Sequence, residues 1–351
     1  MCGIFAIFSN DGQPIEGQDL EGSKHSLREL AYRQSGKQRH RGPDSTGVVV
    51  LPEHGVAMVH ERLRIVGVEM ATKIMRERDP SFRLKTFSVG LRNAPDFEFA
   101  RQVAKYIGSD HTELVFEIDE ALDGIRDIVY FLETYDAVPV RCGLPMLLLT
   151  RYIKSTGIKM ILSGEGADEI FGGYLYFHKA PNYDEFHAEL VKRLHMIHLT
   201  DCLRANKVAM AKGVELRVPF LDTDFVNYVM SIRPQDKIPG PLNAYKDEQQ
   251  SRPEKFVLRA AFADNYLPDS ILWRQKEQFS AGVGYDWVDN MCRVVSDHVS
   301  TEEFEQAAQR FPFHTPTTKE EFYYRCIFEQ QFPGESAARI VPKRVLRLDW
   351  A

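Results

Sequence analysis

The spacing of apolar residues divides the chain into parts with different predicted structures. Over residues 1–66, short apolar runs at Cys2–Phe8, Gly47–Leu51 and Val56–Val59 predict strands, and a polar stretch over Leu20–Gln38 predicts a helix between the first two. These elements predict part of a layered, β-rich domain.

From about residue 70, short apolar runs alternate with longer helical patterns. The short runs predict strands at Thr86–Val89, Glu113–Phe116 and Lys159–Leu162. The longer patterns predict helices at Pro95–Ile107, Glu120–Leu132 and Leu144–Ser155. This alternation indicates an α/β domain with a parallel sheet, and from Phe186 onward the chain is predicted to be mainly helical.

Composition limits the classes of function. Hydrophobic residues make up 44% of the 351 residues, which supports a substantial core. The net charge of −6 gives no case for binding nucleic acid or an anionic membrane surface. The sequence has no apolar run of membrane-spanning length and no signal-peptide pattern, so we expect a cytoplasmic protein. Its five scattered cysteines indicate reduced thiols.

The most informative motif is the twelve-residue string Ser-Gly-Glu-Gly-Ala-Asp-Glu-Ile-Phe-Gly-Gly-Tyr at residues 163–174. It follows a predicted strand, and its four glycines allow the backbone to turn sharply and to approach a ligand closely. Its carboxylates, Glu165, Asp168 and Glu169, suit a magnesium ion or an amino group. The alternative is an ordinary acidic strand-to-helix turn, but a full string is more specific than a spaced pattern.

This string resembles the synthetase domain of glutamine-dependent asparagine synthetases. Six further strings resemble that family in the same order, at Phe87–Leu91, Glu133–Asp136, Tyr176–Pro181, Arg204–Lys207, Glu215–Asp222 and Trp273–Glu277. Strings resembling the start of the family's glutaminase domain lie at Met1–Phe5, Arg39–Asp44 and His60–Leu63.

One family motif is absent from the sequence. The family carries a Ser-Gly-Gly-Leu-Asp-Ser pyrophosphate loop ahead of the Phe-Ser-Val-Gly strand, and this chain contains no such string. We interpret the jump between Gly67 and Ala71 as an internal deletion. It predicts a truncated glutaminase domain at residues 1–68 and a truncated synthetase domain at residues 69–351. The resemblance implies a partial N-terminal-nucleophile-type β-rich domain, followed by a truncated parallel α/β ATP-pyrophosphatase-like domain with a helical C-terminal part.

The resemblance assigns the glutaminase chemistry to Cys2, because a terminal cysteine places its thiol beside a free α-amine that can act as its base. It assigns glutamine binding to Arg62, Leu63, Arg64, Ile65 and Val66, where the planar fork of an arginine suits a carboxylate. The alternatives are an ordinary buried Cys2 and a solvated Arg62. The family's oxyanion donors lie in the missing segment, so we expect weak glutamine hydrolysis.

In the synthetase half, the resemblance implies that Mg²⁺ and ATP activate aspartate to β-aspartyl-AMP, which ammonia from glutamine then converts to asparagine. It implies ATP contacts at Val89, Ser163 and Gly164. Each has a plain alternative: Val89 would be buried as a strand residue in any case, and the other two lie in a turn.

Three charged residues complete the implied synthetase site. Glu165 would handle protons or position the reacting groups, and Asp168 would bind magnesium or the substrate amino group. Lys276 would neutralise charge on the α-phosphate. The alternatives are helix-start acids favoured by the helix dipole and a solvated charged turn.

Two hypotheses follow. The first is an asparagine synthetase of impaired activity, because the missing loop would supply backbone donors to the leaving pyrophosphate. The second is a non-catalytic paralogue or isoform that forms a homo-oligomer or binds an intact homologue, because the deletion would expose a sheet edge. A β-lactam synthetase fits less well, since the Cys2 start and Tyr176–Pro181 match asparagine synthetase better.

Overall fold

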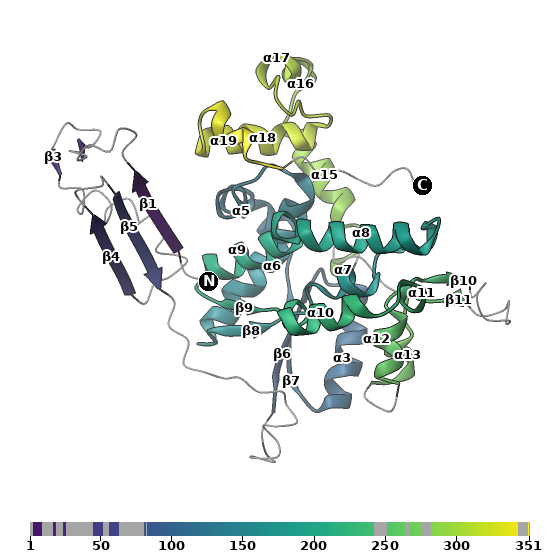
Figure 1. Ribbon diagram of the computed structural model, residues 1–351. Helices are drawn as coiled ribbons and strands as arrows, with labels where there is room; N and C mark the ends of the chain where they lie inside the picture. Colours follow the sequence, from purple (N-terminus) through teal and green to yellow (C-terminus); the bar gives the residue numbers. More distant parts are fainter. Residues whose placement is uncertain are drawn as a thin grey trace. The chain divides into compact units, whose positions relative to one another are not determined.

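The computed structural model describes residues 81, 83–241, 251–263, 267–275, 282–342 and 350, together with the backbone of short strands within residues 3–62 (Figure 1). The chain forms two compact units. The first consists of Met1–Glu69, Thr150–Ile161 and Asn206–Arg217. The second consists of Met70–Leu149, Leu162–Ala205 and Val218–Ala351. The predicted division into domains 1–68 and 69–351 stays a prediction.

The first unit contains an antiparallel sheet in the order β1-β5-β4. Its strands are β1 (Gly3–Phe8), β4 (Ser45–Leu51) and β5 (Val56–Arg62), which agree with the three apolar runs. Gly3 lies opposite Glu61, and Ser45 lies opposite Arg62. These strands do not by themselves identify a glutaminase domain.

Two further short strand pairs involve this unit. β2 (Gly17–Gln18) pairs with β3 (Lys24–His25). The predicted helix over Leu20–Gln38 is therefore wrong at the two residues of β3. A polar stretch without an apolar face carries only a weak helix signal. β8 (Met160–Leu162) pairs with β9 (Glu215–Arg217), and the amide of Glu215 donates to the carbonyl of Lys159 at 2.7 Å.

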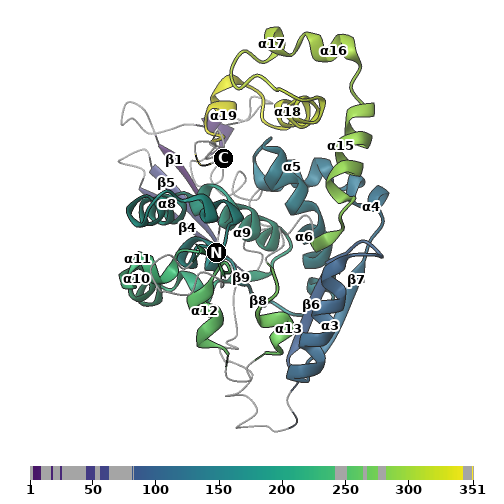
Figure 2. The ribbon, with the colours of Figure 1, turned by 90° about the vertical axis from the view of Figure 1, so that its right-hand side faces the viewer.

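The second unit begins with a β-α-β segment. β6 (Lys85–Gly90) and β7 (Asp110–Val115) are parallel, and α3 (Pro95–Ile107) connects them and packs alongside them (Figure 2). Pro95 fits the first turn of α3, and Gly108 ends the helix in the left-handed conformation with a φ of 63°. The predicted helix and the parallel pairing of the first two predicted strands are therefore confirmed, whereas the third predicted strand, Lys159–Leu162, does not join this sheet among the described strands.

Helices make up most of the rest. They are α4 (Ile118–Asp123), α5 (Ile125–Leu132), α6 (Ala137–Ser155), α7 (Ala167–Phe171), α8 (Tyr183–Met196), α9 (Asp201–Ala211), α10 (Thr223–Ser231), α11 (Pro234–Lys237), α12 (Phe256–Ala261), α13 (Asp269–Leu272), α15 (Trp287–Asp297), α16 (Thr301–Glu305), α17 (Ala307–Arg310), α18 (Lys319–Gln331) and α19 (Glu335–Arg339). Short 3₁₀ helices lie at Leu175–Lys179, Ile197–Leu199 and Pro219–Leu221, and β10 (Gly240–Pro241) pairs with β11 (Ser251–Arg252). The structure is thus mixed α/β, with mostly helices, the parallel pair β6–β7 and short antiparallel pairs. In the described part of the chain, no helix has the length and apolar character needed to cross a bilayer.

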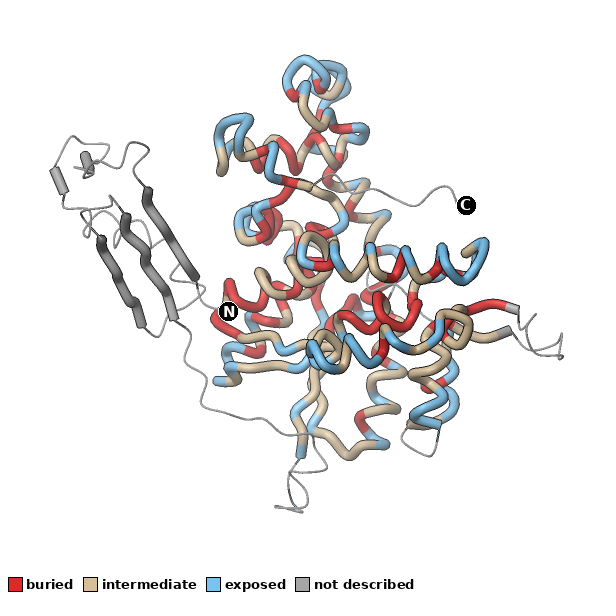
Figure 3. The backbone as a smooth tube through the Cα atoms, in the orientation of Figure 1, coloured by how far each residue is buried: buried red, intermediate tan, exposed pale blue. Residues whose placement is uncertain are grey.

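The core of the second unit fixes the glycine-rich string. Ile170 and Phe171 of α7 are buried with Val229 of α10, and Phe171 meets Phe220 and Phe225 at ring-centroid distances of 6.4 and 6.2 Å. All residues of α7 except Asp168 are buried (Figure 3). The apolar side chains of this short helix anchor it, and the acidic residues at its start are held in place by that packing.

Candidate active site

The turn between β8 and α7 carries the first part of the string. Gly166 precedes α7 with a φ of 96°, a conformation that suits glycine, and a Cβ there would lie 2.5 Å from Cγ and Cδ2 of Leu221. The amide of Ala167 donates to the carbonyl of Gly164 at 3.3 Å. Gly164 itself is exposed, and a Cβ at this position would meet no atom within 4 Å. The turn therefore needs glycine at 166 for its fold and leaves the backbone at 164 open.

Two glycines end α7 for a different reason. Gly172 has a φ of 68°, and a Cβ there would lie 2.8 Å from the ring of Phe186. At Gly173 a Cβ would lie 2.0 Å from Oδ1 of Asp168 and 2.5 Å from Cε of Lys255. The missing side chain at 173 is what allows Asp168 and Lys255 to meet.

Glu165 lies against an arginine of α9. Nη2 of Arg204 donates to Oε1 of Glu165 at 2.9 Å and lies 3.2 Å from Oδ1 of Asp201. The side chain of Arg204 is only 7% exposed. Burial raises the pKa of Glu165, with further increases from Asp201 and Asp168, while Arg204 acts in the opposite direction. Glu165 is thus a carboxyl whose proton affinity is increased, although it has a cationic partner.

Asp168 lies against a lysine that is distant in sequence. Oδ2 of Asp168 is 3.1 Å from Nζ of Lys255, and both side chains are mostly buried. Lys255 immediately precedes α12 and has a φ of 58°, which is uncommon for a residue with a Cβ. The carboxylate that the sequence assigns to a cation is therefore paired with a protein ammonium in this structure.

Glu169 points into the protein. It is 3% exposed, and the hydroxyl of Tyr174 donates to its Oε1 at 2.5 Å. Burial raises the pKa of Glu169 to about 7, and Asp201 and Asp168 add to the increase, while the bond from Tyr174 opposes it. Burial also raises the pKa of the nearby Cys202 thiol to about 12, so this cysteine is a neutral thiol at neutral pH.

The sequence of the chain matches the family model described as asparagine synthase over residues 69–184 and 179–348. The chain belongs to this family. It is 51% identical over 260 residues to asparagine synthetase B [glutamine-hydrolyzing] of Escherichia coli (strain K12), an alignment that covers 74% of this chain and 45% of the relative. It is 49% identical over 274 residues to a glutamine-hydrolyzing asparagine synthetase of Arabidopsis thaliana, covering 77% of this chain and 45% of the relative.

A glutamine-hydrolyzing asparagine synthetase of Saccharomyces cerevisiae is 48% identical over 274 residues, which cover 76% of this chain and 47% of the relative. The chain therefore spans less than half the length of these asparagine synthetases. This shortfall fits the internal deletion that we interpret from the sequence. The resemblance on which the site predictions depend is confirmed at the level of the family.

Four of the predicted site residues, Ser163, Gly164, Glu165 and Asp168, lie together on the turn before α7 and in its first residues. Val89 lies near the end of β6, opposite Leu114 of β7, with 9% of its surface exposed. Their individual roles stay predictions.

The other predicted site residues fall largely outside the described part of the chain. Cys2, Leu63, Arg64, Ile65, Val66 and Lys276 lie outside the described residues. Arg62 is described only as the last residue of β5, without its side chain. The predictions for glutamine binding and for the lysine are therefore untested.

The acidic turn fits one kind of magnesium site. In the described ranges, no group of three His, Cys, Asp or Glu residues is placed to hold a metal ion. Magnesium bound to nucleotide phosphates usually needs only one or two protein carboxylates. Asp168 supplies one carboxylate on this glycine-rich turn, whose Oδ2 already pairs with Nζ of Lys255, and the described residues do not fit a metal cage formed by protein alone.

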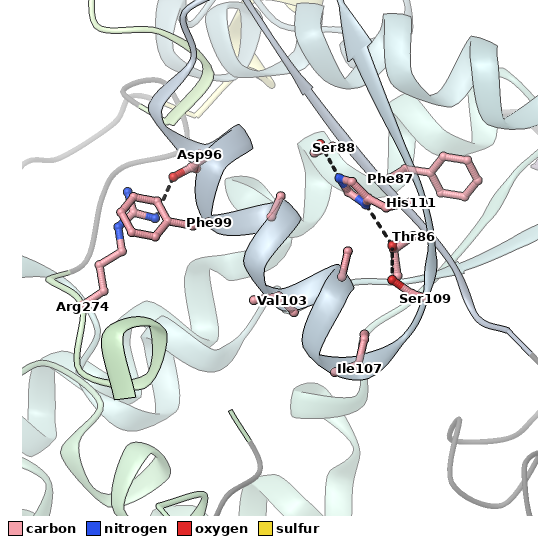
Figure 4. A pocket seen from close by; sticks show the side chains of 12 residues that line it. Thr86, Phe87, Ser88, Asp96, Phe99, Val103, Ile107, Ser109, His111 and Arg274 are labelled. Carbon is pink, nitrogen blue, oxygen red and sulfur yellow. Dashed lines mark hydrogen bonds and ion pairs between the residues drawn. The ribbon is translucent and has the colours of Figure 1, made fainter. Parts of the chain in front are cut away.

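A separate hollow of about 400 Å³ lies between α3 and the strands β6 and β7 (Figure 4). On one side Thr86 and Ser88 are hydrogen-bonded to the two ring nitrogens of His111, at 2.9 and 3.0 Å. On the other side Arg274 pairs with Asp96 at 2.8 Å. The residues that line this hollow do not include Val89 or any residue of the acidic turn.

Sequence reasoning missed several partners of the acidic turn. Arg204 and Tyr174 lie within strings that resemble the family, so a signal was present for both. Lys255 lies outside every such string and more than eighty positions from Asp168 in sequence, so no local pattern indicated it. Only the tertiary fold brings it to the turn.

Proposed function

We propose that this chain is a shortened asparagine synthetase whose acidic turn forms part of an aspartate-adenylating site of low activity. In the proposed reaction, a carboxylate oxygen of aspartate attacks the α-phosphorus of ATP, and pyrophosphate leaves. The nitrogen of ammonia then attacks the resulting acyl-adenylate, a proton is lost, and asparagine and AMP are released. Membership of the family, together with the Glu165–Arg204 pair on the glycine-rich turn, carries this proposal.

The residues of the turn have proposed roles that match their surroundings. The exposed backbone at Gly164 and the neighbouring Ser163 would lie along the nucleotide, and Val89 would contact the adenine. Glu165 would take up or position a proton during attack by ammonia, because burial raises its pKa toward the range where proton transfer is efficient. Magnesium, when bound with the phosphates, would offset their negative charge near Asp168.

The absent pyrophosphate loop supports the proposal of low activity. Backbone donors to a developing charge each contribute roughly 2.7–4 kcal/mol to transition-state stabilisation, so losing several slows the reaction greatly. The family's oxyanion donors for glutamine hydrolysis also lie in the missing segment. Cys2 and Arg62 would therefore retain at most a weak glutaminase site within residues 1–68, and we propose ammonia as the better nitrogen donor.

The test is an assay with aspartate, Mg-ATP and ammonia. It measures the asparagine formed by mass spectrometry, and also the amount of pyrophosphate released. We expect slow formation of both products. Glu165→Gln should abolish this activity, and Glu302→Gln, which replaces an exposed acid of α16, should leave it unchanged. Turnover at an ordinary rate of about 1–10³ s⁻¹ would contradict the low activity. Failure to bind Mg-ATP by calorimetry would contradict the adenylating site itself.

A second proposal is that the chain binds an intact homologue without catalysis. Among the described strands, β6 pairs with β7 alone, so its other edge offers backbone groups to a further strand. Size-exclusion chromatography with light scattering, on the chain alone and mixed with a full-length asparagine synthetase, distinguishes the two proposals. Separate elution of the two proteins would count against this one.

A further inference from the structure

His178 lies in the string Tyr176–Pro181, which none of the roles above uses. Its Nε2 donates to Oε1 of Glu254 at 2.8 Å, and the side chain of Glu254 is only 5% exposed. Burial opposes the charge on this carboxylate, but the bond from His178 and the nearby Arg259 lower the pKa of Glu254 below its usual value. A buried, charged acid that joins two distant segments needs such partners to be stable.

Arg259 holds the same residue from the other side. Its Nε donates to the carbonyl of Glu254 at 2.6 Å, and its Nη1 donates to the carbonyl of Arg274 at 2.8 Å. Nη1 also donates to the carbonyl of Leu272 at 2.5 Å. The side chain and the main chain of Glu254 are therefore both fixed, and α12 is tied to the segment that follows α13.

The next residue is Lys255, whose left-handed backbone is unusual for a residue with a Cβ. Such a conformation persists when the surrounding structure fixes it, and the anchors of Glu254 supply that constraint. With this backbone conformation, the side chain of Lys255 passes Gly173, and its Nζ lies 3.1 Å from Oδ2 of Asp168. The contacts at residues 178, 254 and 259 therefore lie next to the lysine that meets Asp168.

We propose that His178, Glu254 and Arg259 are positioning residues that hold Lys255 against Asp168 and thereby fix the acidic turn for its substrate. This inference rests on the proposed adenylating function and deepens it, because it assigns a role to a part of the fold outside the glycine-rich string. His178 acts through Glu254 and Lys255, and it does not touch the turn in any described hydrogen bond or ion pair.

The direct test is hydrogen–deuterium exchange, which needs no ligand. The proteins are the wild type, His178→Ala, Lys255→Met and the double variant. His178→Gln is the conservative variant that keeps a donor. The matched control is His198→Ala, at an exposed histidine that bonds the carbonyl of His195, one turn away.

We expect His178→Ala and Lys255→Met each to speed exchange over residues 163–173 about threefold or more, because an ion pair that holds the turn is lost. The double variant should be no faster than Lys255→Met, while His178→Gln and the control should match the wild type. Unchanged exchange over α15 and α18 shows that the fold is kept. Unchanged exchange of the turn in His178→Ala, or additive effects in the double variant, would overturn the proposal.

Calorimetric titration of aspartate in the presence of Mg-ATP separates this proposal from the proposed function. We expect His178→Ala and Lys255→Met to weaken aspartate binding by a similar factor of about ten, again without additivity. A wild type that binds neither ligand contradicts the adenylating function, and in that case the exchange measurements still decide whether the network positions the turn.

Discussion

The four glycines of residues 163–174 differ in backbone conformation and in the space that surrounds them. Gly166 has a left-handed backbone and lies against Leu221, whereas Gly164 faces open space without a positive φ. The sequence shows four glycines of equal appearance, and only the structure separates those that the fold needs from the one that faces open space.

This difference makes a prediction about two matched substitutions. Gly166→Ala should lower the free energy of unfolding by about 1–3 kcal/mol, because the new Cβ meets the branch point of Leu221 and the left-handed backbone disfavours it. Gly164→Ala should stay within about 0.5 kcal/mol of the wild type. Urea unfolding measures both. A Gly164→Ala protein that keeps its stability but loses affinity for Mg-ATP would further support a nucleotide at this position.

Glu169 makes a prediction about pH. Its pKa is about 7 in the folded protein and about 4.5 when unfolded, so the folded state holds the extra proton between these values. The resulting stabilisation is complete below about pH 4.5 and is lost as the pH rises toward 7, by at most about 1.4 kcal/mol per pH unit. We expect Glu169→Gln to remove this dependence on pH, because an amide does not titrate in this range. The amide oxygen can still accept from Tyr174, so the local contact is kept.

The measurement is urea unfolding at pH 5, 6, 7 and 8 at constant ionic strength. The difference in stability between Glu169→Gln and the wild type should grow in favour of the variant as the pH rises. A difference that stays constant across this range would mean that Glu169 titrates normally in the fold.

Among the elements, α3 was predictable and the helices after it less so. Pro95 at the start, a left-handed Gly108 at the end and an apolar face between them are local signals, and the predicted bounds of α3 agree with the structure. The predicted helix Glu120–Leu132 is two helices, divided at Gly124, where a Cβ would lie 3.2 Å from Cδ2 of Leu144. That contact is tertiary, so the sequence pattern could not indicate it.

α6 differs from its prediction at the start. It begins at Ala137, ahead of the predicted Leu144, and it contains Pro145. Gly143 and Pro145 are both weak helix formers, and their local preference indicates a boundary. Close packing outweighs that preference here, since a Cβ on Gly143 would lie 3.0 Å from the side chain of Ile128.

The start of α10 allows a test of one helix signal. The side chain of Asp222 accepts hydrogen bonds from the amides of Asp224 and Phe225, both at 3.1 Å, and so caps the helix. Asp222→Ala should cost about 0.5–2 kcal/mol of stability, because these amides lose their acceptor. Asp222→Asn keeps an acceptor and should cost much less. Thermal and urea unfolding check both, and equal losses in the two variants would argue against capping as the cause.

At the scale of the whole molecule, the sequence predicts the family and the class of fold but not how distant segments pair. The β6–β7 pairing follows from a short β-α-β segment, whereas the contacts of Lys255 with Asp168 and of His178 with Glu254 join segments that are far apart in sequence. The acidic turn was recognisable because its string is contiguous. The residues that hold it in place were not, because no period or motif connects them.

A buried ion pair between α6 and α18 makes the last prediction. Nε of Arg141 donates to Oε1 of Glu320 at 2.7 Å, and the hydroxyl of Tyr324 donates to the same oxygen at 3.0 Å. The side chain of Glu320 is 3% exposed, so Arg141→Met leaves a buried charge without its cation and should cost about 3–5 kcal/mol. The exposed pair of Arg92 and Glu117 is the matched control, and Arg92→Met should cost at most about 1 kcal/mol.

The double variant Arg141→Met with Glu320→Gln separates loss of the pair from loss of packing. If the cost arises from the uncompensated carboxylate, neutralising it should restore part of the stability that Arg141→Met loses, and the two substitutions should be strongly non-additive in urea unfolding. Because the pair connects residues 179 positions apart, such coupling would show that α18 stabilises the start of α6. Additive losses would instead mean that each side chain stabilises its own helix independently.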